Sequence, residues 1–278
     1  MKRGSWGALA LLCACGVGSE KVDEDTVPNP SDTSDTSDTS DTSDTSDTGA
    51  EELPWGDGPH TVSGAAYFFD MPELPNIVQI HDVEGAVVYV REAPELRVEL
   101  SAGDSHAFSI AGIPDGARFT LAIEHPDYVP TLTGVLVADG DISGVTFQHM
   151  SDNIGTLAAG YLGADLDDPS VCHMATTVSA AGADDVWAPG EPDATVTLSP
   201  EVPSEAGPWY FNTQVLPDMT LSETTTDGGV IVVGVEPGTY TWTGHKEGVD
   251  FVDLEMACVG GWLTNASPPY GLDVAPEG

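Results

Sequence analysis

The chain has 278 residues, of which 46 are acidic and 7 are Lys or Arg, and its formal net charge is −39. After residue 48, 36 acidic residues remain against 4 basic residues. A surface this acidic repels nucleic acid and anionic lipid, so nucleic-acid binding is excluded as a function. The remaining length is enough for one large or two small domains.

The first predicted element is a secretory signal at residues 1–14. Lys2 and Arg3 precede an apolar run that is shorter than the roughly 20 residues a membrane-spanning helix needs. The run ends in LCAC, which resembles the bacterial lipobox and implies that Cys15 is acylated as the first mature residue, anchoring the protein in the membrane through its lipid. An ordinary cleaved signal with an incidental Cys15 is the alternative. Gly16 rather than aspartate follows, which favours the outer membrane.

Residues 15–58 are predicted to be a linker. It contains six perfect Ser-Asp-Thr tripeptides, from Ser31 to Thr48. Small hydroxyl residues with an aspartate at every third position have no apolar surface to bury, and their charges repel one another. We therefore expect a disordered, extended spacer.

The next segment, 59–150, has the pattern of short antiparallel strands. Apolar and polar residues alternate between turn sequences such as AGD, IPDG and ADGD. The predicted strands cover 86–90, 96–100, 107–110, 119–123, 134–138 and 144–147. This segment is predicted to fold as a first β-sandwich.

A short helix is predicted at 151–168, between two sets of strands. Ser151 and Asp152 offer a helix cap, and Gly155 and Gly160 weaken the helix. The apolar residues at three- and four-residue spacing are Ile154, Leu157, Ala158, Tyr161 and Leu162.

The last segment, 169–278, repeats the strand pattern and is predicted to be a second sandwich. Its predicted strands cover 173–180, 194–199, 209–212, 220–224, 230–235, 239–244 and 251–259.

Two stretches resemble the core of carboxypeptidase regulatory-like domains, which are transthyretin-like (prealbumin-like) sandwiches. They are AFSIAGIPDGARFTLAIEHPDYVPTL in the first half and TTTDGGVIVVGVEPGTYTWTGHKEGV in the second. In the second, residues 226–229 match the family's turn, 235–238 its corner and Tyr240 its aromatic residue. The first departs more, since residues 101–104 replace the turn and Asp127 stands where the family has glycine. The resemblance implies an all-β chain of two antiparallel sandwich domains, joined by the short helix and preceded by the disordered linker. The matching residues shape turns and corners, and none is read as catalytic.

The pilin-type collagen-adhesin B repeats are a related sandwich family that crosslinks a lysine to an asparagine. The first half has no lysine and the second has only Lys246, on a late strand or turn. We expect no such crosslink here.

Cys172 and Cys258 are the cysteines left once Cys13 is cleaved and Cys15 is acylated. An even pair in an exported chain predicts a disulfide. A metal site that adds His173 and His245 is the alternative, but neighbouring Cys and His side chains on a strand point to opposite faces.

Other candidate sites are few. Asp165, Asp167 and Asp168 carry oxygen ligands that suit calcium, but the EF-hand pattern is incomplete and we favour a solvated turn with a helix stop at Pro169. No motif of a serine hydrolase or of a phosphate-binding loop occurs. Carboxylates scattered across the chain leave a hydrolase as an alternative. Trp187 and Trp262, beside proline or glycine, are the candidate ligand-binding aromatics.

Together these features predict an exported, lipid-anchored, non-enzymatic protein with no cofactor. We expect it to face the cell surface from the outer membrane and to present its sandwiches for adhesion, or for binding an extracellular or envelope protein or polysaccharide. A periplasmic structural or accessory protein shares every one of these features.

Overall fold

The computed structural model describes residues 54–70, 79–81, 83–101, 106–166 and 168–276, which belong to one compact unit beginning at Glu52. Within these ranges the chain is all-β apart from a single short helix, as the sequence predicts. The predicted signal peptide, Cys15 and the SDT repeat lie outside the described residues. In the described part, no helix is long and apolar enough to cross a membrane.

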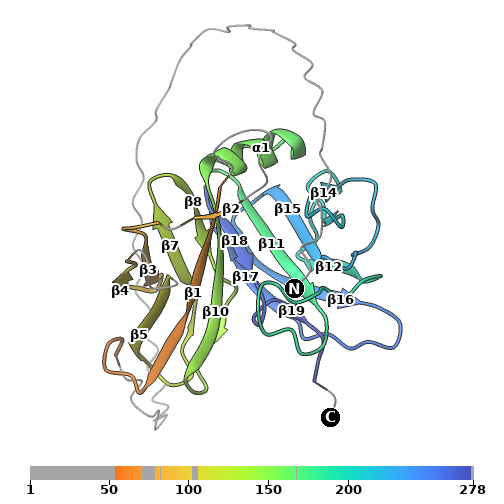
Figure 1. Ribbon diagram of the computed structural model, residues 1–278. Helices are drawn as coiled ribbons and strands as arrows, with labels where there is room; N and C mark the ends of the chain where they lie inside the picture. The colour runs from red at the N-terminus through yellow and green to blue at the C-terminus, as the bar shows by residue number, and fades with distance from the viewer. Residues whose placement is uncertain (1–53, 71–78, 82, 102–105, 167, 277–278) are drawn as a thin grey trace, which may run out of the picture. The chain divides into compact units, whose positions relative to one another are not determined.

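The first sheet is built around strand β1 (His60–Asp70). Strand β10 (Ile142–Met150) runs parallel to β1, while β2 (Gln79–His81) and β5 (Ala107–Ile113) pair with it antiparallel. Figure 1 shows β1 and β10 side by side. The prediction of antiparallel strands throughout is therefore wrong at this pair.

The largest sheet has ten strands, in the order β14-β13-β15-β11-β18-β8-β7-β3-β4, with β19 also paired to β11. Its strands are β3 (Val87–Val90), β4 (Ala93–Glu99), β7 (Leu121–His125), β8 (Tyr128–Leu132), β11 (Cys172–Ser179), β13 (Trp209–Phe211), β14 (Pro217–Asp218), β15 (Gly229–Val235), β18 (Leu263–Ala266) and β19 (Leu272–Asp273).

Two smaller sheets complete the fold. One contains β12 (Thr195–Ser199), β16 (Gly238–His245) and β17 (Leu254–Cys258), and the other contains β6 (Arg118–Phe119) and β9 (Leu136–Val137).

Two separate apolar cores lie between these sheets, so each half of the unit is a β-sandwich. The first core includes the fully buried rings of Phe68, Phe119 and Phe147. The second is centred on Trp242 and includes Met256, both 0% exposed. Along each strand, residues that point into the core alternate with residues that point outward, and this produces the alternation of apolar and polar residues in the sequence.

The two halves repeat the same strand pairings. In the first half β1 pairs with β10 in parallel and with β5 antiparallel, and β7 pairs with β3 and β8 antiparallel. In the second half β11 pairs with β18 in parallel and with β15 antiparallel, and β16 pairs with β12 and β17 antiparallel. The predicted corner motifs, 113–116 and 235–238, occupy matching places at the ends of β5 and β15.

The halves are joined edge to edge. Strand β18 pairs in parallel with β8, so one sheet continues from the second half into the first (Figure 1). Beside this joint, Thr146 Oγ1 donates to the Pro268 carbonyl at 2.8 Å, and Tyr270 OH donates to the Ser143 carbonyl at 2.8 Å. The chain after β18 thus packs on the first half.

Helix α1 (Asp152–Leu162) lies between β10 and β11 in the chain. Ser151 caps its first turn by accepting a hydrogen bond from the Ile154 N–H, as predicted. The helix ends at Leu162, six residues before the predicted 168, because Gly163 takes a left-handed conformation with φ 68°. Gly155 and Ala159 are its buried residues. The predicted apolar face is wrong at Leu157 and Tyr161, which are exposed.

Strand assignment from the sequence also fails at several strands. Strands β8 and β18, which join the halves, lie outside every predicted strand. Strand β1 was not predicted, because its stretch AAYFFD is apolar on both faces and shows no alternation. The predicted strand at 220–224 is instead a loop, in which Thr224 Oγ1 accepts from the Ala194 N–H and donates to the Glu191 carbonyl.

Candidate functional site

Three aromatic side chains from two distant parts of the chain meet at the surface. Trp187 packs against Tyr67 with ring centroids 5.9 Å apart and against Phe69 at 6.3 Å, edge to face in both cases. We call Tyr67, Phe69 and Trp187 the aromatic cluster. Trp187 is 60% exposed, while Tyr67 and Phe69 are partly buried. The cluster is the strongest candidate for a binding surface among the described residues.

Local structure fixes each member of the cluster. Tyr67 and Phe69 are two residues apart on β1, so both point to the face opposite Phe68, whose ring lies in the first core. Trp187 lies in the loop after β11, where its backbone N–H donates to the Asp185 carboxylate at 2.7 Å. The Ala180 N–H donates to the Pro189 carbonyl across the base of that loop at 3.4 Å.

Polar groups border the cluster. Asp184 and Asp185, close to Trp187 in the same loop, are both exposed carboxylates. Gln148 is the register partner of Tyr67 on β10, and its amide donates to Ser267 Oγ at 3.0 Å. Rings flanked by hydrogen-bonding groups are typical of sites that bind polar ligands with an apolar face.

The sequence predicted only part of this cluster. Trp187 was a candidate and is exposed, whereas the other candidate, Trp262, is only partly exposed and has no ring partner among the described residues. Tyr67 and Phe69 were missed because β1 was missed. The sequence signal for them is the stretch AAYFFD itself, because aromatic residues are enriched in strands.

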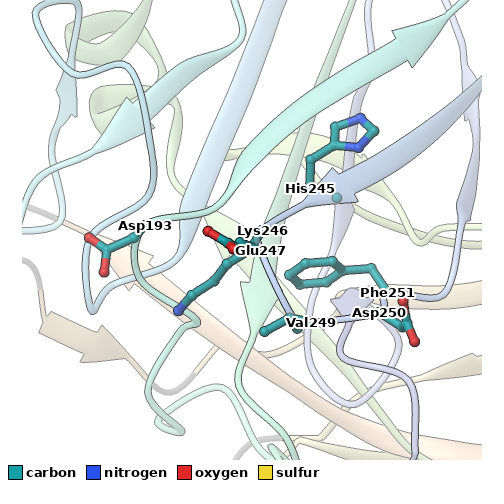
Figure 2. A pocket seen from close by; sticks show the side chains of 8 residues that line it. Asp193, His245, Lys246, Glu247, Val249, Asp250 and Phe251 are labelled. Atoms are coloured by element: carbon teal, nitrogen blue, oxygen red, sulfur yellow. The ribbon is translucent and has the colours of Figure 1, made fainter.

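An open pocket of about 630 Å³ lies at the turn between β16 and β17 (Figure 2). Its lining residues are Asp193, Gly244, His245, Lys246, Glu247, Val249, Asp250 and Phe251. Lys246, the only lysine of the second half, makes an ion pair with Glu191 and donates to the Pro192 carbonyl. Because its ammonium group is already held by these two partners, the pocket offers little free positive charge.

A second pocket, of about 500 Å³, lies where β8 and α1 begin, and Asp70, His125, Asp127 and Tyr128 are among its lining residues. Behind Tyr128 is His149, which is 0% exposed and has its ring centroid 5.1 Å from that of Tyr128. Burial lowers the pKa of His149 to about 3, against a smaller upward effect from the Val129 backbone. His149 is therefore a neutral core residue at ordinary pH.

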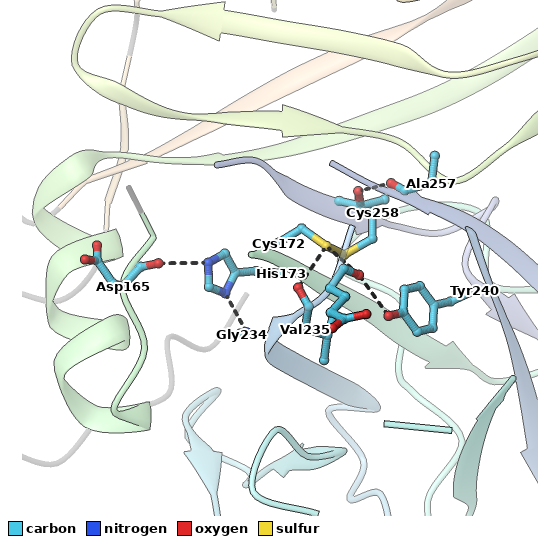
Figure 3. The surroundings of a disulfide bond; sticks show 10 residues. Asp165, Cys172, His173, Gly234, Val235, Tyr240, Ala257 and Cys258 are labelled. Atoms are coloured by element: carbon cyan, nitrogen blue, oxygen red, sulfur yellow. Dashed lines mark hydrogen bonds between the residues drawn. A yellow bond between two sulfur atoms is a disulfide. The ribbon is translucent and has the colours of Figure 1, made fainter. Parts of the chain in front are cut away.

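The predicted disulfide between Cys172 and Cys258 is present, with its Cα atoms 5.6 Å apart (Figure 3). It links β11 in the large sheet to β17 in the three-stranded sheet, across the second core. His173 points away from it, with Nε2 3.1 Å from the Asp165 carbonyl and Nδ1 accepting from the Gly234 N–H. Burial lowers the pKa of His173, so this imidazole is a structural hydrogen-bonding group.

Of the three predicted calcium ligands, the structure describes Asp165 and Asp168. Asp165 uses its backbone oxygen for His173, and Asp168 accepts from the Ser170 N–H and hydroxyl, which lower the pKa of its carboxyl group. Asp167 lies outside the described residues. In the part of the chain that the structure describes, no three His, Cys, Asp or Glu side chains are placed to hold a metal ion. Calcium binding stays a prediction.

Two carboxyl groups are of interest for acid–base chemistry, since burial raises the pKa of Asp227 and of Asp273. Asp227 accepts from the Gly229 N–H within its own turn, and neither residue lines the two pockets above. Their surroundings explain the raised pKa without a substrate site.

Comparisons with known proteins returned no matching protein family and no matching curated protein sequence. Solved structures match weakly. The Bacillus anthracis TIE protein is 9% identical with a TM-score of 0.21, over 78% of this chain and 34% of that one, so this chain spans about a third of its length. GBS52, the minor pilin of Streptococcus agalactiae, is 9% identical with a TM-score of 0.24, over 79% and 98%. The shaft pilin SpaA of Lactobacillus rhamnosus GG is 12% identical with a TM-score of 0.22, over 79% and 98%. The resemblance to carboxypeptidase regulatory-like domains stays a prediction.

Proposed function

We propose that this chain is an exported, lipid-anchored protein of the cell envelope whose β-sandwich unit binds a partner without catalysing a reaction. The observation that carries the proposal is the aromatic cluster, because Trp187 is 60% exposed on a unit crosslinked by a disulfide. Exposed rings held in place by their surroundings bind at a low cost in conformational entropy.

Export is supported by the buried Cys172–Cys258 bond. Disulfides persist in oxidising compartments and are rare in the cytosol. The lipobox-like LCAC sequence supports acylation of Cys15, and the acidic spacer that follows would hold the unit away from the membrane. We further propose the outer membrane, with the unit facing the cell surface.

Lipid attachment is tested by growing cells with a fatty acid that carries an alkyne and detecting the label on the full-length protein. We expect label on the wild type and on Cys13→Ser, because Cys13 leaves with the signal peptide, and none on Cys15→Ser. Equal labelling of the wild type and Cys15→Ser would contradict the anchor.

Orientation is tested by digesting intact cells with proteinase while a periplasmic marker is followed as the control. Loss of the sandwich unit with survival of the marker is expected for surface display. Protection until the outer membrane is permeabilised would instead favour the periplasmic structural role.

A further inference from the structure

We propose that the aromatic cluster binds the pyranose rings of a neutral polysaccharide, with Trp187 as the stacking surface and Asp185 as a hydrogen-bond acceptor for sugar hydroxyl groups. This inference rests on the proposed binding function and names its ligand class.

The first step is the exposure of Trp187. A ring that served only to pack the two halves together would be buried, yet Trp187 is 60% exposed. Its edge-to-face contacts with Tyr67 and Phe69 keep the ring in place. Single exposed apolar residues are common on protein surfaces, but three grouped rings are not scattered residues. The indole is thus both fixed and accessible.

The second step is the polar border. The Asp185 carboxylate accepts from the backbone N–H of Trp187 at 2.7 Å, which fixes this carboxylate in the same loop as the indole ring. Sugar rings combine an apolar face of C–H groups with a rim of hydroxyl donors. An aromatic ring beside a fixed carboxylate matches both features, and the exposed Asp184 adds a second acceptor.

The third step is size and charge. A stable protein partner needs about 800 Å² of surface on each side, whereas three rings, two of them partly buried, match one or two sugar rings. With 36 acidic against 4 basic residues after residue 48, the unit repels anionic glycans. A neutral polysaccharide is the ligand class that satisfies both limits.

The test uses full-length protein extracted from membranes in a polyoxyethylene detergent, which has no sugar headgroup to compete. Binding to insoluble cellulose, chitin and crosslinked dextran is measured by depletion from solution, with crosslinked polygalacturonate as the anionic control. We expect the wild type to bind at least one neutral polysaccharide and not the anionic one.

Matched variants locate the site. Trp187→Ala should weaken binding by about tenfold or more, and Trp187→Phe by less, since a smaller ring is kept. Trp262→Ala, which changes a partly exposed tryptophan outside the cluster, should bind as the wild type does. Thermal unfolding of each variant reports whether the fold is intact, and the weakening by Trp187→Phe in a fully folded protein carries the test if Trp187→Ala unfolds.

Equal binding by folded Trp187→Ala and wild type overturns the proposal, as does failure of the wild type to bind any of the neutral polysaccharides. Capture of a protein through Trp187 without polysaccharide binding would also overturn it. None of these outcomes alters the acylation and proteinase experiments, so the glycan inference and the envelope assignment fail separately.

Discussion

His149 shows how a single buried residue makes the stability of this protein depend on pH. Its imidazole is 0% exposed and packs beside Phe68 and Tyr128. Burial lowers its pKa to about 3, whereas the unfolded chain has the ordinary value near 6.5. Above pH 6.5 both states are neutral. As the pH falls the unfolded state takes up the proton first, so stability is lost between about pH 6.5 and 3.

We therefore expect His149 to contribute a loss of about 1.4 kcal/mol in the free energy of unfolding per pH unit through this window. Denaturant unfolding at several pH values measures it, and His149→Phe should remove that part of the slope. His245→Gln is the control, because it removes an exposed histidine from the other half of the unit. A slope that is identical in His149→Phe and in the wild type would contradict the assignment.

At the scale of elements, the disulfide is expected to provide much of the stability of the second sandwich. It joins residues 86 apart in sequence. Closing a loop of that length lowers the conformational entropy of the unfolded chain, which stabilises the folded state by about 4 to 5 kcal/mol. The double variant Cys172→Ala/Cys258→Ala should lose a comparable free energy of unfolding, measured by urea titration. A loss below about 1 kcal/mol would mean that the crosslink adds little to the packing of β11 against β17.

Helix α1 contains two glycines with opposite roles. A Cβ atom at Gly155 would lie 2.7 Å from Val129 Cγ2, whereas at Gly160 it would meet nothing within 4 Å. Gly155→Ala should therefore destabilise the protein by about 1 to 3 kcal/mol through overpacking. Gly160→Ala should stabilise it by about 0.5 to 1 kcal/mol through helix propensity. Thermal unfolding of the two variants distinguishes the effect of overpacking from that of helix propensity. Midpoint shifts of the same sign in both variants would contradict this explanation.

Most strands could be predicted because each half buries one face of its sheets, which leaves alternation in the sequence. The orientation of pairing could not, since alternation is the same in parallel and antiparallel strands, and β10 lies parallel to β1. The disulfide followed from cysteine counting, and the choice of Trp187 from Pro189, two residues after it. Its partners Tyr67 and Phe69 could not be assigned, because contact between β1 and the loop after β11 depends on how the halves join.

At the scale of the whole molecule, the shared sheet argues that the two halves unfold together. The β8–β18 pairing, the bond from Gln148 to Ser267 and the contact of Tyr270 with the first core all cross between the halves. Independent domains usually meet through more polar, mobile interfaces and lack shared strands. Breaking the joint would expose two sheet edges, so the folded state of one half depends on the other.

This dependence can be measured by using the disulfide, which lies wholly in the second half, as a local perturbation. Hydrogen exchange of the full-length protein in increasing urea is followed by mass spectrometry on peptides from β3 and β7 and from β15 and β16. If the halves form one cooperative unit, Cys172→Ala/Cys258→Ala lowers the unfolding midpoint of both sets of peptides equally. If only the second set shifts, the halves are independent, and the edge pairing of β8 with β18 is too weak to couple them. We expect the equal shift, because the paired strands β8 and β18 are buried where the halves join, with Leu132 and Leu263 at most 1% exposed.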